Sequence, residues 1–310
     1  MATRATPTLK KEMEVQVSII IVNYNCEGHT CNCIDSIYKY TKDIAFEVIV
    51  VDNASNVYSV EAIAKRFPDV KIIINKENRG FGAANNVGAK NATGKYLFFL
   101  NPDTILLSDG VGVFYDFLEN ASNEVACCGG NLVRVDGTPN KSFGNFPSVL
   151  QQFSDIGFRK LYKKLYFEKL AMGKVCDFTD IRGVNYLVGA AFFIKRQVFE
   201  EIGSFDEEFF MYYEETDLFF RLNKAGYKAY LLPSVKIIHL EGVTMENRDP
   251  FSYSMWAFME KSRYYYFKKN KGRFSSFCVR MVQMLSITLL YCFGKTPVNL
   301  KRALMITLKA

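Results

Sequence analysis

The alternation of short apolar segments with segments of helical spacing constrains the fold of this 310-residue chain most strongly. Four segments are predicted strands, at residues 17–22, 46–51, 70–74 and 96–100, and the first is a continuous apolar, β-branched run of the kind expected of a strand buried on both faces. The segments between them have helical character, at residues 29–40, 60–67 and 82–92. Strands separated by helices in this way predict an α/β fold with a doubly wound, mostly parallel central sheet.

The second half of the chain is less regular. We expect a hairpin at Asp136-Gly137, strands at 190–194 and 235–238, and a helix at 214–225 that ends at Gly226. No linker marks a clean internal boundary. The predicted organisation is therefore a disordered lead-in, one domain in two halves and a helical tail, at residues 1–16, 17–130 with 131–250, and 251–310.

Polar residues follow three of the four predicted strands at the point where each strand ends. In open parallel sheets, ligands bind beyond the carboxyl ends of the strands. Taken one at a time, Asn and Asp are ordinary turn residues. As a set they predict one ligand-binding crevice, lined by Asn23, Asn25, Asp52, Asn53, Asn101 and Asp103.

Asp103 is a candidate metal ligand because it follows a buried strand in the tripeptide Asn101-Pro102-Asp103. Hard divalent cations take oxygen ligands and are commonly held by one or two carboxylates together with substrate phosphates. An Asx-Pro turn is an equally good reading of the tripeptide alone. His239, at the end of another predicted strand, meets Asp103 if both strands belong to one sheet, although a lone histidine is more often structural.

Three acids begin the helix predicted at 214–225. Glu214 and Asp217 are three residues apart and share a helix face, whereas Glu215 points elsewhere. Neighbouring aromatic rings disfavour the ionised carboxylate, which suits a general base. The alternative is an acidic first turn that complements the helix dipole.

The segment at 77–86 is a candidate phosphate contact. Gly80 permits a close backbone approach, the following helix N-terminus favours an anion, and Arg79 is a candidate partner for phosphate. The chain has neither G-x-G-x-x-G after its first strand nor a phosphate-binding G-x-x-x-x-G-K-[ST] loop.

The formal charge of +7 is concentrated in the tail. Residues 251–310 contain 11 Lys and Arg and a single acid, whereas the other 250 residues carry a net charge of −3. Basic residues interleaved with aromatic ones favour an anionic membrane surface. A solvated helix packed on the domain or a partner is the alternative. The longest uncharged run near the end, at 281–294, is too short to predict a spanning helix.

Six segments, taken in order, resemble a family 2 glycosyltransferase of the GT-A type. They are VSIIIVNYN (17–25), VIVVDNAS (48–55), ENRGFGAANN (77–86), YLFFLNPD (96–103), FFMYYEETDLFFRLNKAGY (209–227) and IIHLEG (237–242). NPD in place of D-x-D, with the acidic helix, resembles rhamnosyltransferase-like members that act on bacterial surface polysaccharides.

The resemblance implies a GT-A fold, a nucleotide-sugar donor (dTDP- or UDP-linked), Mg²⁺ or Mn²⁺, and inverting transfer to a glycan or lipid-linked acceptor, with rhamnose as one candidate sugar. The half at 17–130 would bind the donor and the half at 131–250 would hold the acceptor and the catalytic acid. Asp52 would contact the nucleoside, Asp103 and His239 would bind the metal, and Glu215 would be the general base. The expected donor-binding set is Asn23, Asn25, Asp52, Asn53, Arg79, Gly80, Asn101 and Asp103.

Two residues depart from the family pattern. Asn101 replaces the first acid of D-x-D, and Glu215 stands where Asp is more usual, so that Glu214 or Asp217 is a candidate to share its role.

The expected location is cytoplasmic, peripheral to the inner face of the plasma membrane. One alternative is a non-catalytic sugar-nucleotide-binding or scaffold protein on the same fold. Nucleic-acid binding is not expected, because no recognisable nucleic-acid motif accompanies the positive charge.

Overall fold

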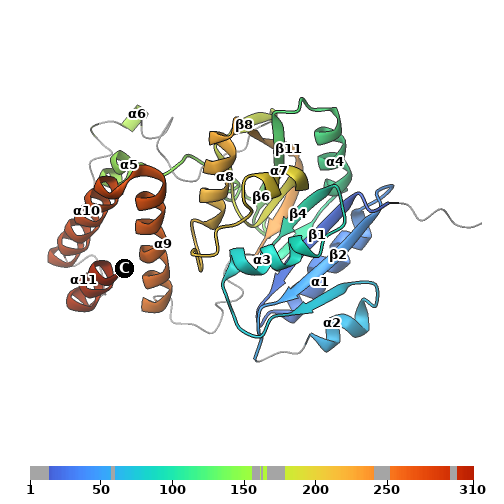
Figure 1. Cartoon of the computed structure of the whole chain (residues 1–310), viewed down its shortest axis with the longest axis horizontal. Helices are drawn as coiled ribbons and strands as arrows, with labels where there is room; N and C mark the ends of the chain where they lie inside the picture. Colours follow the sequence, from blue (N-terminus) through green and yellow to red (C-terminus); the bar gives the residue numbers. More distant parts are fainter. Residues whose placement is uncertain are drawn as a thin grey trace, which may run out of the picture.

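The computed structural model describes residues 14–56, 60–155, 161, 163–165, 179–240, 252–293 and 299–310. An α/β domain with a twisted central sheet lies beside a group of tail helices (Figure 1). The expected lead-in lies outside these residues up to residue 13, as do parts of the expected acceptor half at 166–178 and 241–250.

Eight strands form the main path of the sheet in the order β3-β2-β1-β4-β10-β6-β11-β5. The parallel pairs are β1 with β2, β1 with β4, β2 with β3, and β6 with β11. β10 runs antiparallel between β4 and β6, while β5 and β8 pair antiparallel with β11. The bounds are β1 Val17–Asn23, β2 Phe46–Asp52, β3 Lys71–Ile74, β4 Tyr96–Leu100, β5 Thr104–Leu106, β6 Val125–Val133, β8 Arg182–Val184, β10 Ala191–Lys195 and β11 Lys228–His239. The mostly parallel α/β sheet predicted from the sequence is confirmed.

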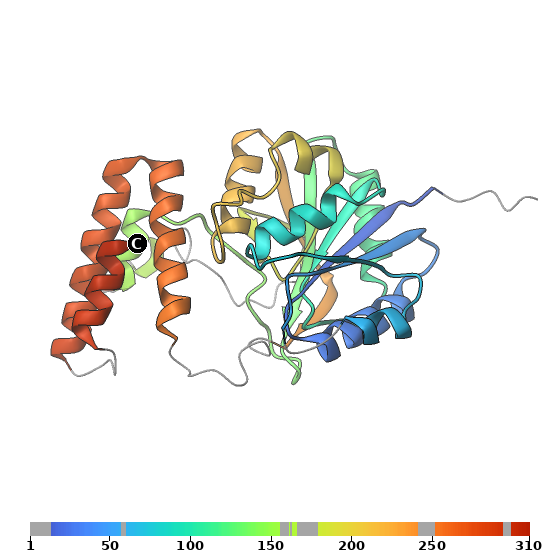
Figure 2. The ribbon, with the colours of Figure 1, turned by 60° about the horizontal axis from the view of Figure 1, so that its bottom comes forward.

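Alternate residues of each central strand face opposite helix layers, as the period of two along a strand requires. On β1, Ile19 and Ile21 join one apolar cluster with helices α1, α2 and α4. Ile20 and Val22 join a second cluster with α3, α7 and α8 on the other face (Figure 2). The bounds are α1 Glu27–Tyr40, α2 Glu61–Arg66, α3 Phe81–Lys90, α4 Gly110–Asn120, α7 Arg196–Glu201 and α8 Glu214–Lys224.

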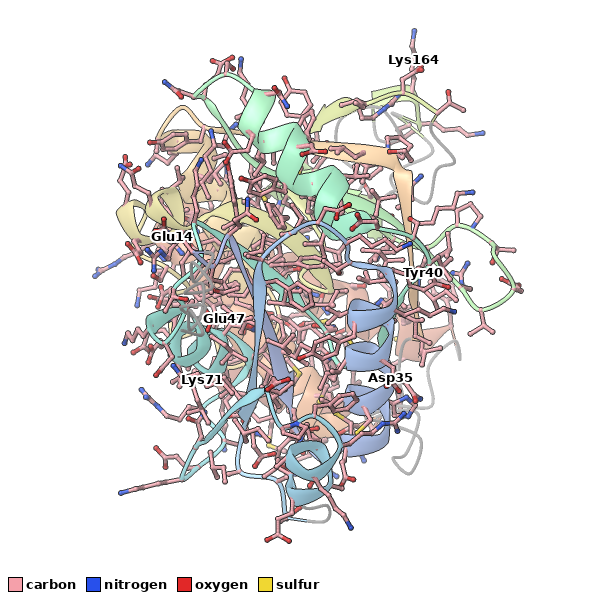
Figure 3. All side chains as sticks on the ribbon, turned by 90° about the vertical axis from the view of Figure 1, so that its right-hand side faces the viewer. Glu14, Asp35, Tyr40, Glu47, Lys71 and Lys164 are labelled. Atoms are coloured by element: carbon pink, nitrogen blue, oxygen red, sulfur yellow. The ribbon has the colours of Figure 1, made fainter. Side chains whose placement is uncertain are left out.

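The outer helices α1 and α2 lie side by side. Figure 3 views the molecule from the right-hand side of Figure 1 and labels Asp35 and Tyr40 on α1. The Asp35 carboxylate accepts from Arg66 of α2 at 2.5 Å, with both side chains about half exposed. Exposed pairs of this kind contribute little to stability, so the two helices depend mainly on the apolar contacts beneath them.

One strand expectation requires correction. The strand predicted at 235–238 begins at Lys228 and spans 12 residues, because residues 228–232 also pair with β6. A register shift after Leu232 interrupts the ladder, which explains why the sequence pattern indicates only its far end. β5 was not predicted, since three residues are too few for a pattern. A separate small sheet pairs β7 Phe143–Gly144 with β9 Tyr186–Leu187.

The tail is helical, as predicted. Its helices are α9 Tyr253–Lys271, α10 Arg273–Cys292 and α11 Leu300–Lys309; α5 Val149–Asp155 packs on α10, and α6 Lys163–Leu165 lies nearby in Figure 1. α9 packs on the α/β domain through Tyr264, Tyr266 and Phe267, which share a cluster with Phe209 and Tyr213.

Within the described part of the chain, α10 is the one helix long and apolar enough to cross a membrane by length and composition. It has 20 residues, and an 18-residue window within it has a mean hydropathy of 1.3 and is 17% buried inside the structure. The expectation that no segment would qualify counted only the uncharged run from Met281, whereas the helix begins eight residues earlier at Arg273. One such helix is weak evidence for a span, because the core helix of a soluble protein meets the same criteria of length and composition.

Gly88 of α3 allows this helix to lie close to the sheet. A Cβ at Gly88 would stand 2.5 Å from Cγ2 of Ile20, a fully buried and conformationally stiff side chain. Gly88→Ala should therefore lower the free energy of unfolding by about 1–3 kcal/mol, despite the better helix propensity of Ala. Chemical denaturation measures the change.

Gly28 of α1 is the matched control, because a Cβ there would meet nothing within 4 Å. Gly28→Ala should leave stability unchanged or raise it slightly. Equal effects of the two substitutions would contradict this account of the α3 contact.

Candidate active site

Asp103 and His239 come together at the carboxyl edge of the sheet. β5 begins directly after Asp103, β11 ends at His239, and their register places His239 opposite Thr104. His239 Nε2 lies 3.4 Å from Asp103 Oδ1, and the two side chains are only 12% and 11% exposed. The two residues therefore meet, as the sequence analysis expected if their strands shared a sheet.

The donor atoms around this pair fit a divalent cation. Asn101 Oδ1 and His239 Nδ1 are buried and have no hydrogen-bond partner among the described residues. A carboxylate oxygen and an imidazole nitrogen are suitable ligands, and substrate phosphates commonly complete such sites. The described residues contain no group of three or more His, Cys, Asp or Glu side chains able to hold a metal. A cation held here would therefore need further ligands, such as oxygens of a bound diphosphate.

Asp52 organises the ends of β1 and β2. Its Oδ1 accepts from Asn23 Nδ2 at 2.7 Å and Ser55 Oγ at 2.6 Å, and its Oδ2 accepts from the Ser55 amide at 3.0 Å. Thr30 Oγ1 donates to Asn23 Oδ1 at 2.8 Å. Asp52 and Asn23 are almost fully buried, so this network fixes the shape of the loop after β2. Ser55 and Thr30 were not identified from the sequence, because single hydroxyl residues in turns give no pattern.

The loop after β2 is also tied to Asn25. The Asn25 side chain donates to Asn56 Oδ1 at 3.1 Å and accepts from the Asn56 amide at 2.9 Å. Asn25 has φ 55°, in the left-handed region that asparagine tolerates better than most residues. The predicted residues Asn23, Asn25 and Asp52 thus form one connected edge.

Asn53 links that edge to the loop before α3. Its Nδ2 donates to Asn78 Oδ1 at 2.8 Å and to the Gly80 carbonyl at 3.2 Å. Gly80 has φ +93°, and a Cβ there would lie 2.2 Å from the Phe210 carbonyl oxygen. Only glycine fits this position, because both the conformation and the space exclude a side chain.

Arg79 and the N-terminus of α3 already have protein partners. Arg79 Nη2 donates to Glu207 Oε2 at 2.8 Å in a largely exposed pair, and the Phe81 amide donates to the Phe210 carbonyl at 3.0 Å. Glu207 also accepts from Asn86 of α3 at 3.1 Å. The loop before α8 therefore lies against α3, a contact that the sequence did not indicate.

Glu214 and Glu215 lie at the start of α8, beside the loop that precedes β10. A Cβ at Gly189 would be 3.6 Å from Cβ and Cγ of Glu215, so that side chain lies over Gly189. The adjacent Ala190 carbonyl accepts from the Asn101 amide at 2.8 Å. This chain of contacts brings the acidic pair to the same edge of the sheet as Asn101 and Asp103.

Burial raises the pKa of both acids. For Glu214 the desolvation is reinforced by the nearby Glu215 carboxylate, and the pKa lies well above its ordinary value. For Glu215 burial is the main cause of the raised pKa, partly offset by backbone hydrogen bonds. Glu214 Oε2 has no hydrogen-bond partner in the part of the chain that the structure describes. A carboxylate with a raised pKa at a partly open position, as Glu215 is, suits a general base.

Asp217, the third predicted acid, has a different environment. Its fully buried carboxylate accepts from Arg221 Nε, Lys269 Nζ and Asn270 Nδ2, each at 2.8 Å. Asp217 is therefore engaged in structural contacts with its own helix and with α9. Lys269 and Asn270 were not linked to the site by the sequence, since more than 50 residues separate them from Asp217.

A pocket of about 430 Å³ opens beside His239. It is lined also by Arg134, Val135, Asp136 and Leu240. The predicted hairpin turn supplies Asp136, and Gly137 there has φ 80° as a tight turn requires.

Comparison with known proteins gives a consistent result. Residues 18–203 match the family model described as Glycosyl transferase family 2. The chain is 26% identical over 248 residues to N-acetylglucosaminyl-diphospho-decaprenol L-rhamnosyltransferase of Mycobacterium tuberculosis, covering 76% of this chain and 79% of that protein. It is 25% identical over 256 residues to rhamnosyltransferase WbbL of Escherichia coli, covering 80% and 92%.

Solved structures share the fold. One is GalNAc-T7 with UDP, GalNAc and Mn²⁺, with a TM-score of 0.59 and 17% identity over 84% of this chain and 52% of that one, about half its length. Another is the mannosyltransferase PcManGT from Pyrobaculum calidifontis with GDP-Man and Mn²⁺, with a TM-score of 0.52 and 14% identity over 96% and 80%. At these identities the likeness establishes the fold alone, which is the GT-A type predicted from the sequence.

Because the pKa of Glu214 is raised in the folded protein, we expect its contribution to the free energy of unfolding to depend on pH. Below the ordinary pKa of 4.5 the group is protonated in both the folded and unfolded chain. Above it the unfolded chain ionises first, so stability falls as pH rises toward the folded pKa, by about 1.4 kcal/mol for each pH unit between the two pKa values. Glu214→Gln should therefore raise the melting temperature at pH 7 but not at pH 4, as thermal unfolding would measure.

Glu200→Gln is the control, because Glu200 is exposed on α7. A gain for Glu214→Gln that is equal at both pH values would contradict a buried, protonated carboxyl group.

Proposed function

The chain belongs to glycosyl transferase family 2 and is a glycosyltransferase that uses a nucleotide-sugar donor, and we propose that it transfers the sugar with inversion to a hydroxyl of a glycan or lipid-linked acceptor. The observation that carries this proposal is the convergence of two groups at one sheet edge. The Asp103–His239 pair would supply ligands for a cation, and the Glu214–Glu215 pair, which lies over the loop beside Asn101, would supply a base. Its enzyme relatives weigh against the alternative of a non-catalytic binding protein.

The donor would bind along the edge formed by β1, β2 and β4. Asp52 would contact the nucleoside, with Asn25 beside it and the buried Asn23 holding the Asp52 carboxylate. Asn53 and Gly80 would complete the wall. Asn101 and Asp103 would face the diphosphate. A dTDP- or UDP-linked rhamnose is our first candidate donor, because two relatives are named rhamnosyltransferases.

Asp103 and His239 would hold a divalent cation, Mn²⁺ or Mg²⁺. Both of the solved structures described above contain Mn²⁺. When bound, the cation would neutralise charge on the leaving diphosphate. Asn101 stands beside this pair with a buried, unpartnered oxygen among the described residues, which would be available to a ligand or a bound water.

Glu215 would act as the general base. Its carboxylate would accept the proton of the acceptor hydroxyl while the hydroxyl oxygen forms a bond to the anomeric carbon and the bond from that carbon to the diphosphate breaks. The products are the glycosylated acceptor, the nucleoside diphosphate and a protonated Glu215. A pKa raised by burial brings the carboxylate closer to the working pH, where a base is most effective.

The test is transfer from a panel of nucleotide sugars with Mn²⁺, with Mg²⁺ and after chelation. Asp103→Ala and Glu215→Gln should each lower kcat by about 10²-fold or more, and chelation should reduce the unsubstituted enzyme to the level of Asp103→Ala. Asp116→Asn and Glu200→Gln, outside the site, are the matched controls. Full transfer by both site variants would contradict the assignment.

The tail would bring the enzyme to the inner face of the plasma membrane, where a lipid-linked acceptor lies. One face of α10 exposes large apolar side chains at Phe274, Phe277, Met281 and Leu285, with exposed fractions of 46–79%. The tail carries 11 basic residues against one acid. An exposed apolar row within a basic segment suits an anionic membrane surface.

Replacing Phe274, Phe277 and Met281 with Ser should reduce binding to anionic vesicles without unfolding the tail, because the buried Val279 and Val282 are kept. Flotation with anionic and neutral vesicles measures the change. Ile74→Ser, at an exposed position on β3, is the control. Unchanged flotation of the triple variant would contradict this docking face, and binding that resists alkaline carbonate would contradict a peripheral attachment.

A further inference from the structure

We propose that tail helix α9 is a positioning element of the active site, in which Ser262 and Lys269 hold the segment that carries Glu214 and Glu215. The inference rests on the proposed role of these acids in transfer. It assigns a second role to the tail, separate from membrane docking.

The segment before α8 has a conformation that needs external support. Tyr212 and Tyr213 have φ 68° and 69°, so two consecutive non-glycine residues occupy the left-handed region. This conformation is unfavourable for a residue with a side chain, and it persists only where the surrounding structure imposes it. The orientation of Glu214 and Glu215 depends on this turn, because they follow it directly.

One face of α9 supplies that support. Ser262 Oγ donates to the Met211 carbonyl at 2.8 Å, and Arg263 Nε donates to Tyr213 Oη at 3.4 Å. The rings of Tyr213 and Tyr266 lie 5.4 Å apart, centroid to centroid. Met211 and Tyr213 are thus held by polar and aromatic contacts from a helix about 50 residues later in the chain.

Phe258 of α9 contacts Phe210, which precedes Met211 in the same segment. Its ring stacks on Phe210 at 4.5 Å. The Phe210 carbonyl accepts from the Phe81 amide and closes over Gly80. α9 is therefore connected through Phe210 to the loop that the donor would meet.

Lys269 joins both ends of the segment. Its Nζ donates to Asp206 Oδ2 at 2.7 Å and to Asp217 Oδ2 at 2.8 Å. Asn270 donates to the other Asp217 oxygen at 2.8 Å. Asp206 precedes the strained turn and Asp217 follows the acidic pair, so these bonds restrain the segment on both sides.

The supporting face of α9 is itself held together by a buried carboxylate. Glu260 is fully buried and accepts from Trp256 Nε1 at 3.2 Å, from Arg263 Nη1 at 2.7 Å and from the Tyr264 hydroxyl. In Figures 1 and 2, α9 is the tail helix that lies beside the α/β domain. A buried, paired carboxylate fixes Arg263 in the position from which it reaches Tyr213.

Ser262→Ala and Lys269→Ala test the proposal. Each should lower kcat for transfer by about tenfold or more, since small displacements of a catalytic group cost up to about 10²-fold. The donor KM should be unchanged. Because Lys269→Ala also removes a partner of the buried Asp217, kcat is compared at a temperature at which thermal unfolding shows every variant to be folded. Ser254→Ala and Lys268→Ala, exposed positions on the same helix, are the matched controls and should keep full kcat. Lys269→Arg should restore most of the loss, because it can again pair with both carboxylates.

A double-mutant cycle separates positioning from general structural damage. If Lys269 acts through the base, adding Lys269→Ala to Glu215→Gln should cause no further loss of kcat. Additive losses would overturn the proposal, as would full kcat in both Ser262→Ala and Lys269→Ala while Glu215→Gln is inactive. A fully active Glu215→Gln variant would instead overturn the proposed base, which distinguishes the two failures.

Discussion

The contact between the α/β domain and the tail helices depends on the hydrogen bonds and ion pairs that α9 makes to the buried carboxylate of Asp217. A buried carboxylate without partners is strongly destabilising, so the folded protein must keep the partners of Asp217 in place. Arg221 comes from the same helix, whereas Lys269 and Asn270 come from α9. Asp217, which the sequence offered as a third catalytic candidate, therefore joins the tail to the α/β domain. The two remaining acids lie in the segment that this joint restrains.

The sheet positions the other half of the site. β10 enters antiparallel between β4 and β6, so its leading loop at Gly189 and Ala190 passes beside Asn101. Glu215 packs over that loop. Asp103 and His239 meet because β5 and β11 pair across the same edge. Two short antiparallel strands thus determine where Glu215 lies relative to Asp103 and His239.

Most of the α/β core, and the placement of several candidate-site residues at one edge of the sheet, could be predicted from the sequence. The strands at 17–22 and 96–100 could be predicted because fully buried strands need continuous apolar residues. The helix at 214–225 could be predicted because its apolar face and the glycine that follows it, Gly226, are local features. The polar residues that follow β1, β2 and β4 were expected at one edge of the sheet because these strands were predicted to be parallel. The long β11, the short β5 and the partners of Asp217 could not be predicted, because each depends on pairing between distant residues.

The sequence by itself determined the fold class, the polar residues at the carboxyl ends of β1, β2 and β4, the family resemblance and the basic charge of the tail, because each of these depends on local composition, spacing or motif order. Only the tertiary structure decided which acids are available for chemistry. The three acids at the start of α8 have nearly the same local sequence context. Burial nevertheless raises the pKa of Glu214 and Glu215, whereas Asp217 forms ion pairs with Arg221 of α8 and Lys269 of α9. Carboxylates take their roles from desolvation and from nearby charges, and both are set by residues that meet only when the chain is folded.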